Sequence, residues 1–180
     1  DTARLLLDRG AEVDRTSTWR KMKGVTSLMV ATYGSHIDVM RLLLERGADL
    51  EAITEANGDT ALLVACACGR VDAARLLLER GADVTRAAVS GPGRGLDALA
   101  TAKYTKKAAV VALLEERLYP LHAAAKTGDV DAMTQLLDDG AEVDAKKDGA
   151  TPLFVACEGG IVDAARLLLD NGAEVNRATE

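Results

Sequence analysis

Three cysteines are the first side chains that could do chemistry, as metal ligands or redox groups. Cys66 and Cys68 stand two positions apart, while Cys157 lies far along the chain. A structural zinc site usually needs about four protein ligands, and no histidine stands near the Cys66–Cys68 pair. Three cysteines also make no disulfide framework. We therefore predict a reducing intracellular compartment, the cytoplasm, and neither a metal nor another cofactor.

Acid–base catalysis is the second kind of chemistry to consider. His36 and His122 are the only imidazoles, and no Ser, Cys or acidic side chain recurs around either in a fixed arrangement. Carboxylates do recur at the first turn of expected helices, where the helix dipole favours negative charge. They are Asp38, Asp72, Asp131 and Asp163. We therefore predict no catalytic residues and no enzyme activity.

Two loop-like stretches carry the remaining candidates. Residues 91–95 (GPGRG) lack the lysine of a phosphate loop and follow no expected strand, so a flexible loop or a widened hairpin is expected. Residues 19–23 (WRKMK) combine the only Trp with cations and a Met, which is the composition of a protein-binding hot spot. The alternative is that Trp19 packs back on a neighbouring loop. Because the net charge is −6 and the basic run is short, no nucleic-acid partner is expected.

The elements that position these side chains are defined by residues 58–84 (GDTALLVACACGRVDAARLLLERGADV). An apolar run over 61–67 is short enough for a two-turn helix, and Gly69 ends it. A second helix over 72–80 has its apolar residues on one face, and Gly81 ends it. Two helices this short cannot bury their apolar faces alone, so the unit requires copies of itself on either side.

Copies of this unit are present at fixed spacing. The pattern recurs 34 positions earlier, 91 positions later, and 32 positions before that later copy. A Gly-Ala-Asp/Glu-Val/Leu motif recurs at Gly10, Gly47, Gly81, Gly140 and Gly172. With TPLFVA at 151–156 and YPLHAA at 119–124, the chain resembles the ankyrin repeat family. The resemblance implies an all-α fold, an α-solenoid of stacked helix-turn-helix pairs with β-hairpin fingers.

The same register predicts the repeat boundaries. Residues 1–14 match the second helix of a truncated repeat, which indicates a fragment of a longer protein. Repeats are expected at 15–50, 51–84 and 119–144, a degenerate repeat with the Gly/Pro-rich loop at 85–118, and a last repeat with the start of another hairpin at 145–180. Arg117 replaces the terminal glycine, and no hairpin precedes Tyr119. We therefore expect a change of stacking angle, or a boundary between repeat blocks, at 118–120.

The resemblance also implies a function, protein–protein recognition by a scaffold or adaptor. The family contacts its partners through finger tips and exposed first-helix positions. The corresponding residues are Trp19, Arg20, Lys21, Met22, Lys23, Val25, Tyr33, Ala56, Asn57, Asp59, Ala67, Cys68, Lys126, Thr127, Lys147, Asp148, Ala150 and Glu158. The alternatives are a structural arm of a large multi-protein assembly and a regulatory segment of a longer enzyme or channel. No apolar run is long enough to cross a bilayer, so no membrane insertion is expected.

Burial is predicted from equivalent repeat positions. Cys66 and Cys157 share a position at which the family usually has Ala, so both are expected to be small buried groups, and Cys68 a partly exposed thiol. The leucine triplets at 42–44, 76–78 and 167–169 become Gln-Leu-Leu at 135–137. A buried Gln needs hydrogen-bond partners. The first triplet position is therefore expected near the surface, and the other two in the core.

Overall fold

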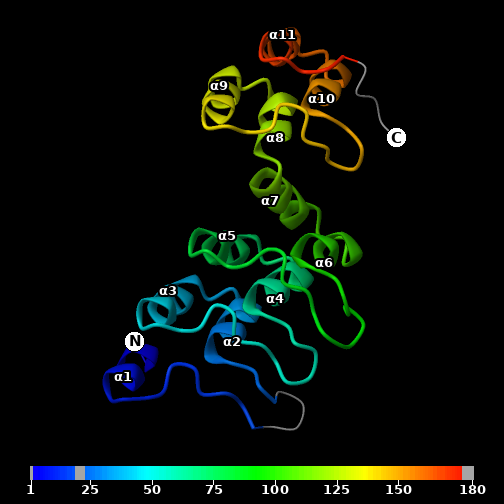
Figure 1. Cartoon of the computed structure of the whole chain (residues 1–180). Helices are drawn as coiled ribbons and strands as arrows, with labels where there is room; N and C mark the ends of the chain where they lie inside the picture. The colour runs from blue at the N-terminus through cyan, green and yellow to red at the C-terminus, as the bar shows by residue number, and fades with distance from the viewer. Residues whose placement is uncertain (1, 19–22, 176–180) are drawn as a thin grey trace. The chain divides into compact units, whose positions relative to one another are not determined.

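The computed structural model describes residues 2–18 and 23–175, and every helix or strand assigned within them is an α-helix (Figure 1). Lys147 and Ala150 form an isolated antiparallel bridge. The chain divides into two compact units, Asp1–Leu114 and Glu115–Glu180, which we call the first and the second unit. The predicted all-α solenoid of stacked helix pairs is confirmed.

The helices alternate between first and second members of a pair. They are α1 (Thr2–Asp8), α2 (Ser27–Gly34), α3 (Ile37–Glu45), α4 (Ala61–Cys68), α5 (Val71–Glu79), α6 (Ala98–Tyr104), α7 (Ala108–Leu118), α8 (Pro120–Thr127), α9 (Val130–Asp138), α10 (Pro152–Glu158) and α11 (Val162–Asp170). α1 is a second helix, α2 and α3 form a pair, and the alternation continues to α10 and α11. The division between the two units falls inside α7.

Side-chain caps begin most of the first helices. The Thr60 hydroxyl accepts a hydrogen bond from the Leu63 N–H at 3.3 Å. The equivalent caps of α2, α10 and α6 are Thr26, Thr151 and Asp97. A cap of this kind stabilises a helix by about 1 kcal/mol. The caps therefore fix where each short first helix starts, and with it the register of the residues that its open face presents.

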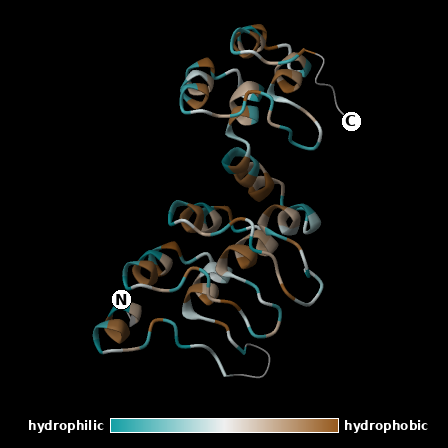
Figure 2. Ribbon diagram, viewed as in Figure 1, coloured by the Kyte–Doolittle hydropathy of each residue, from teal (hydrophilic) through white to brown (hydrophobic). Residues whose placement is uncertain are grey.

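Within the first unit the helices form two layers (Figure 1). α2, α4 and α6 pack side by side in one layer, α3 and α5 pack in the other, and α2 and α4 contact the second helices of their own pairs. The core is made of Leu, Ala, Met, Val and Cys side chains from both layers. In Figure 2 the hydrophobic colour is concentrated on the helices, and much of the connecting loops is pale or teal. Neighbouring pairs thus supply each other's core.

The leucine triplets correct one predicted pattern of burial. At 76–78 in α5 all three leucines are buried, with 2%, 0% and 7% of their surface exposed. The third leucine of α11, Leu169, is 44% exposed, and the first leucine of α1, Leu5, is 55% exposed. The first position therefore packs toward the preceding repeat and the third toward the following one. The prediction of a surface position for Leu76 was wrong, because burial depends on the neighbouring repeat. Gln135 is exposed in the earliest complete second helix of its unit.

The second unit has the same plan and its own core. α8 packs against α10, α9 packs against α11, and Leu121, Met133 and Leu168 are buried between them. The Nε2 atom of His122 in α8 lies 3.0 Å from the carbonyl oxygen of Ala150 in the following finger. Burial lowers the pKa of His122 below its usual value. The neutral imidazole therefore ties the first helix to that finger.

Candidate interaction surface

Three equivalent residues form a row on the open face of the first unit. Tyr33, Ala67 and Tyr104 each lie seven positions after the N-cap of α2, α4 or α6. All three are exposed, the tyrosines to 63% and 65% of their surface. Because α4 packs between α2 and α6, Ala67 lies between the two aromatic side chains. We call Tyr33, Ala67 and Tyr104 the tyrosine row.

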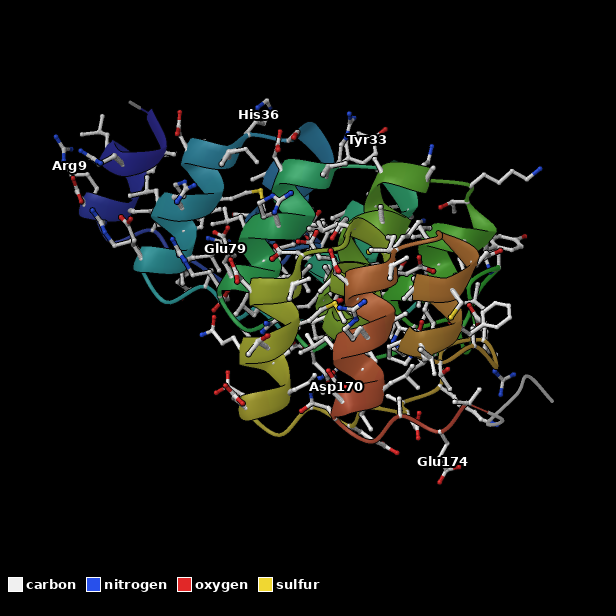
Figure 3. The ribbon with its side chains drawn as sticks, turned by 90° about the horizontal axis from the view of Figure 1, so that it is seen from above. Arg9, Tyr33, His36, Glu79, Asp170 and Glu174 are labelled. Atoms are coloured by element: carbon white, nitrogen blue, oxygen red, sulfur yellow. The ribbon has the colours of Figure 1, made fainter. Side chains whose placement is uncertain are left out.

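Cations lie at the helix ends beside this row. The Nε–H of Arg70 donates a hydrogen bond to the Tyr33 carbonyl oxygen at 3.0 Å, across the C-terminus of α2. A methyl group at Gly69 would come within 2.9 Å of the Lys107 Cδ atom, so the Lys107 stem lies against the C-terminus of α4. Positive charge is favourable at a helix C-terminus. The arrangement thus stabilises each helix end and holds a cation next to the row. Tyr33 and His36 lie along the same edge of the ribbon (Figure 3).

Lys106 occupies an unusual backbone position in the same loop. Its φ is +57°, in the left-handed region, where the equivalent residues after α4 and α8 are Gly69 at +71° and Gly128 at +74° and the one after α2 is Ser35 at +56°. A residue with a Cβ atom adopts this conformation at a cost of about 1 kcal/mol relative to glycine. Lys106 is exposed. Its ammonium group therefore reaches solvent from a position at which glycine would give a more stable backbone.

Negative charge is unevenly distributed along this edge. Asp38 and Asp72 lie in the first turns of α3 and α5, whereas the equivalent residue of α7 is Ala109. Within the described part of the chain, Arg70, Lys106 and Lys107 form no ion pair with a carboxylate. The edge of the first unit is therefore most positive at the loop between α6 and α7.

The predicted basic finger is only partly visible. Trp19, Arg20, Lys21 and Met22 lie outside the described residues. The Nζ atom of Lys23 lies 2.6 Å from Oε2 of Glu55 in the next finger, and this hydrogen bond raises the pKa of Lys23. Val25 is half-buried and lines an open groove of about 610 Å³ beside the start of α2. The groove is also lined by Arg15, Val30 and His36.

The next two fingers of the first unit are bonded to each other. The carbonyl oxygen of Ala56 accepts a hydrogen bond from the Ser90 hydroxyl at 2.6 Å, and that of Asn57 accepts from the Val89 N–H at 2.9 Å. The Asn57 side chain donates to the carboxylate of Asp59. The Gly/Pro-rich stretch is thus a hairpin closed by backbone bonds between residues 88 and 95–96 and docked on the preceding finger. Ala56 is exposed, and Asn57 and Asp59 are half-buried.

The predicted contact residues of repeats five and six belong to the second unit. Lys126, Thr127, Asp148 and Glu158 are exposed, and Ala150 is half-buried. Lys147 is half-buried, because its Nζ atom lies 2.8 Å from Oε2 of Glu115 and 5.9 Å from the centre of the Tyr119 ring. The predicted set is therefore split between two units. The tyrosine row brings together Tyr33 and Ala67 from that set, with Cys68 half-buried beside them.

The cysteines differ from their predicted burial at one position. Cys66 is fully buried, and burial raises its thiol pKa to about 12. Cys157 is exposed, so its predicted burial was wrong. The equivalent residues Thr32, Cys66 and Ala125 are buried under the next first helix, and no first helix follows α10 in the described chain. No group of three His, Cys, Asp or Glu side chains in residues 2–18 and 23–175 could hold a metal ion.

The sequence reasoning missed Tyr104, Lys106 and Lys107. The fourth repeat departs too far from the family pattern, so the family's contact positions were not carried onto it. Asp97 was the available signal, because Asp caps helices as well as Thr does. Counting seven residues from Asp97 gives Tyr104, the same position as Tyr33.

Comparison with known proteins identifies the family. The family profile described as ankyrin repeats (3 copies) matches residues 1–88 and 94–179. The crystal structure of the human ASB11 ankyrin repeat domain is 30% identical in sequence, with 86% of this chain and 72% of that chain covered and a TM-score of 0.46. A search of curated proteins gave no match. None of the described helices has the length and apolar character required to span a membrane.

Proposed function

Because this chain belongs to the ankyrin repeat family, whose repeats are generally protein–protein interaction modules, we propose that it is a non-enzymatic scaffold or adaptor. It binds a protein partner through its finger tips and the exposed face of its first helices. The observation that carries the proposal is the tyrosine row, in which two large aromatic side chains stay exposed on a regular array. Exposed aromatic side chains on a rigid support are typical of binding hot spots.

The packing around the row supports a binding role. Thr32, the residue before Tyr33, is buried and donates a hydrogen bond to the Leu28 carbonyl oxygen at 2.8 Å. The fingers of the same unit are joined by the Lys23–Glu55 ion pair and by the bonds from Ser90. A surface held in this way loses little conformational entropy when a partner binds.

We include residues 19–22 and the exposed residues of the second unit as further contacts. With a net charge of −6, we propose no nucleic-acid partner.

A pull-down with the whole chain as bait tests the proposal. Proteins retained by the wild type should be lost with the double variant Tyr33→Ala/Tyr104→Ala. They should be kept by Val162→Ala, which trims an equally exposed apolar side chain at the start of α11. Thermal melting should be nearly the same for all three proteins, because the trimmed side chains are exposed. An identical set of retained proteins for the wild type and both variants would show that the tyrosine row binds no partner.

A further inference from the structure

Resting on the proposed function, we propose that the first unit recognises an acidic peptide segment of its partner in extended conformation. The segment lies across α2, α4 and α6. An apolar side chain of the segment occupies the low position at Ala67, between Tyr33 and Tyr104. Its carboxylates lie toward the loop between α6 and α7, at Lys106 and Lys107.

The shape of the tyrosine row defines the apolar part of this site. Ala67 ends at its Cβ atom, so the middle of the row is lower than the two tyrosine rings that flank it. Val30, one turn before Tyr33, is 48% exposed and extends the apolar surface along α2. Tyrosines present a large contact area with few rotatable bonds, which favours their use in binding surfaces. An aliphatic or aromatic side chain between the rings would be covered on two sides.

Charge defines the other part of the site. The Lys107 ammonium stands on a stem that lies against Gly69, and Arg70 uses its Nε–H on Tyr33 and keeps the other guanidinium donors for a ligand. Asp72 in α5 partly offsets Arg70, whereas α7 offers Ala109 at the equivalent place. Positive charge is therefore least compensated beside Tyr104, and this places the carboxylates of the segment at that end of the row.

The backbone of Lys106 is an independent observation. A lysine is held in a left-handed conformation at a position where three other repeats have glycine and the repeat of α2 has Ser35 at +56°. Residues held in unfavourable backbone conformations cluster at functional sites. Glycine here would give the same turn with less strain and no charge. Ser35 shows that a side chain is tolerated here, and of the two non-glycine residues only Lys106 brings a charge to the end of the tyrosine row.

The spacing of the repeats sets the length of the segment. Neighbouring packed helices are about 8–10 Å apart, so the row from Tyr33 to Tyr104 spans about 16–20 Å. An extended chain rises about 3.3 Å per residue. About five or six residues therefore cover the row, with one apolar side chain near the middle and acidic side chains at one end.

A displayed library of random peptides of about eight residues tests the inference, with the full chain as bait. Selected peptides should be enriched in Asp and Glu beside an apolar residue. Their affinity should fall roughly 2- to 30-fold in Lys106→Gly/Lys107→Ala, the effect of two exposed ion pairs, and should weaken with added salt. Lys146→Ala, which removes an exposed lysine in the second unit, should change nothing. Lys106→Gly alone should not lower the melting temperature, because glycine suits that backbone.

The outcomes separate this inference from the proposed function. Selected peptides without acidic enrichment, or with unchanged affinity for Lys106→Gly/Lys107→Ala, would overturn the acidic segment. If such peptides were still lost with Tyr33→Ala/Tyr104→Ala, the tyrosine row would remain a binding surface for another chemistry. A library that yields no peptide would also overturn the inference, and the pull-down would then decide the proposed function by itself.

Discussion

Leu76→Ala tests the packing of one repeat against its predecessor. Leu76 is 2% exposed in α5, and the equivalent first leucine of α1, Leu5, is 55% exposed. The substitution removes about three carbon groups, each worth about 0.8 kcal/mol when buried, and leaves a cavity that adds to the loss. We expect Leu76→Ala to lower the free energy of unfolding by about 2.5–5 kcal/mol. Leu5→Ala should lower it by about 1 kcal/mol, since half of that side chain is already in water.

Urea unfolding followed by far-UV circular dichroism measures these losses. Leu77→Ala, fully buried in the same helix, serves as the reference and should cost about as much as Leu76→Ala. The three positions lie in one unit, so their effects can be compared on the same transition. If Leu76→Ala cost no more than Leu5→Ala, the first leucine would not be packed against the preceding repeat. The predicted surface position would then have been right.

Three further changes have defined outcomes. Thr60→Ala removes the cap of α4 and should cost about 1 kcal/mol in urea unfolding, while Thr60→Ser should cost clearly less. Burial raises the thiol pKa of Cys66 from 9.0 to about 12, so its contribution to stability is present below about pH 9 and falls as the pH rises. Cys66→Ala should make urea stability less steeply dependent on pH above 9, and an unchanged slope would contradict the buried thiol. Burial lowers the pKa of His122 below the ordinary histidine value of 6.5, so its contribution to stability is present above about pH 6.5 and is lost as the pH falls. The melting temperature of His122→Gln should therefore fall less with decreasing pH than that of the wild type. An equal fall in both proteins would contradict the buried neutral imidazole.

The fold was predictable because its signals are local and repeated. Thr60 and Gly81 mark where the helices of one repeat start and stop, and copies at fixed spacing recur along most of the chain. A single cap or glycine is a weak signal, but several in the same register leave few alternatives to a stack of helix pairs. The family and the all-α solenoid followed from that register and are confirmed.

Burial was less predictable because it depends on which neighbour covers a position. Cys66 and Cys157 are equivalent in sequence, yet one is buried under α6 and the other is exposed. Leu76 and Leu5 differ in the same way. Aligning the repeats identifies equivalent residues. It does not show whether a neighbouring repeat covers each of them. The surface position predicted for Leu76 came from the equivalent residue Gln135, whose exposure does not apply to a second helix that has a preceding repeat packed against it.

The sequence predicted only part of the tyrosine row, because the fourth repeat departs from the pattern of the others. Tyr33 and Ala67 came from repeats with a clear threonine cap, whereas Tyr104 follows Asp97 and was passed over. The conformation of Lys106 could not be predicted either, because a lysine gives no sign of a positive φ. Sequence reasoning thus identified the intact part of the row and stopped where the repeat is degenerate, which is where the positive charge is greatest.

The loss of one glycine accounts for the most unusual feature of the chain. Glycines with φ of +83° to +90° follow α1, α3, α5, α9 and α11, and each lets the chain leave the helix toward a finger. The expectation that Arg117 takes this place was wrong by one residue, because Arg117 corresponds to Arg80 in α5. Leu118 stands at the glycine position of the fourth repeat, where the left-handed conformation is costly. α7 therefore continues to Leu118, and the Tyr119 N–H donates to the Glu115 carbonyl oxygen at 2.8 Å. The chain then enters α8 at Pro120 without a finger.

The missing finger also removes a bond that joins repeats elsewhere. Four residues after the terminal glycine, Asp14 and Glu51 each accept a hydrogen bond from a backbone N–H of the next repeat, at 3.0 and 2.9 Å. Asp144 does the same in the second unit. A chain that passes directly from α7 to α8 has no residue at this position to accept such a bond. Thr85 also lacks this bond, and its repeat stays within the first unit, so the carboxylate is not sufficient to explain the division. We infer that the division of the core into two clusters inside α7 follows from the residue at the helix end through the missing finger.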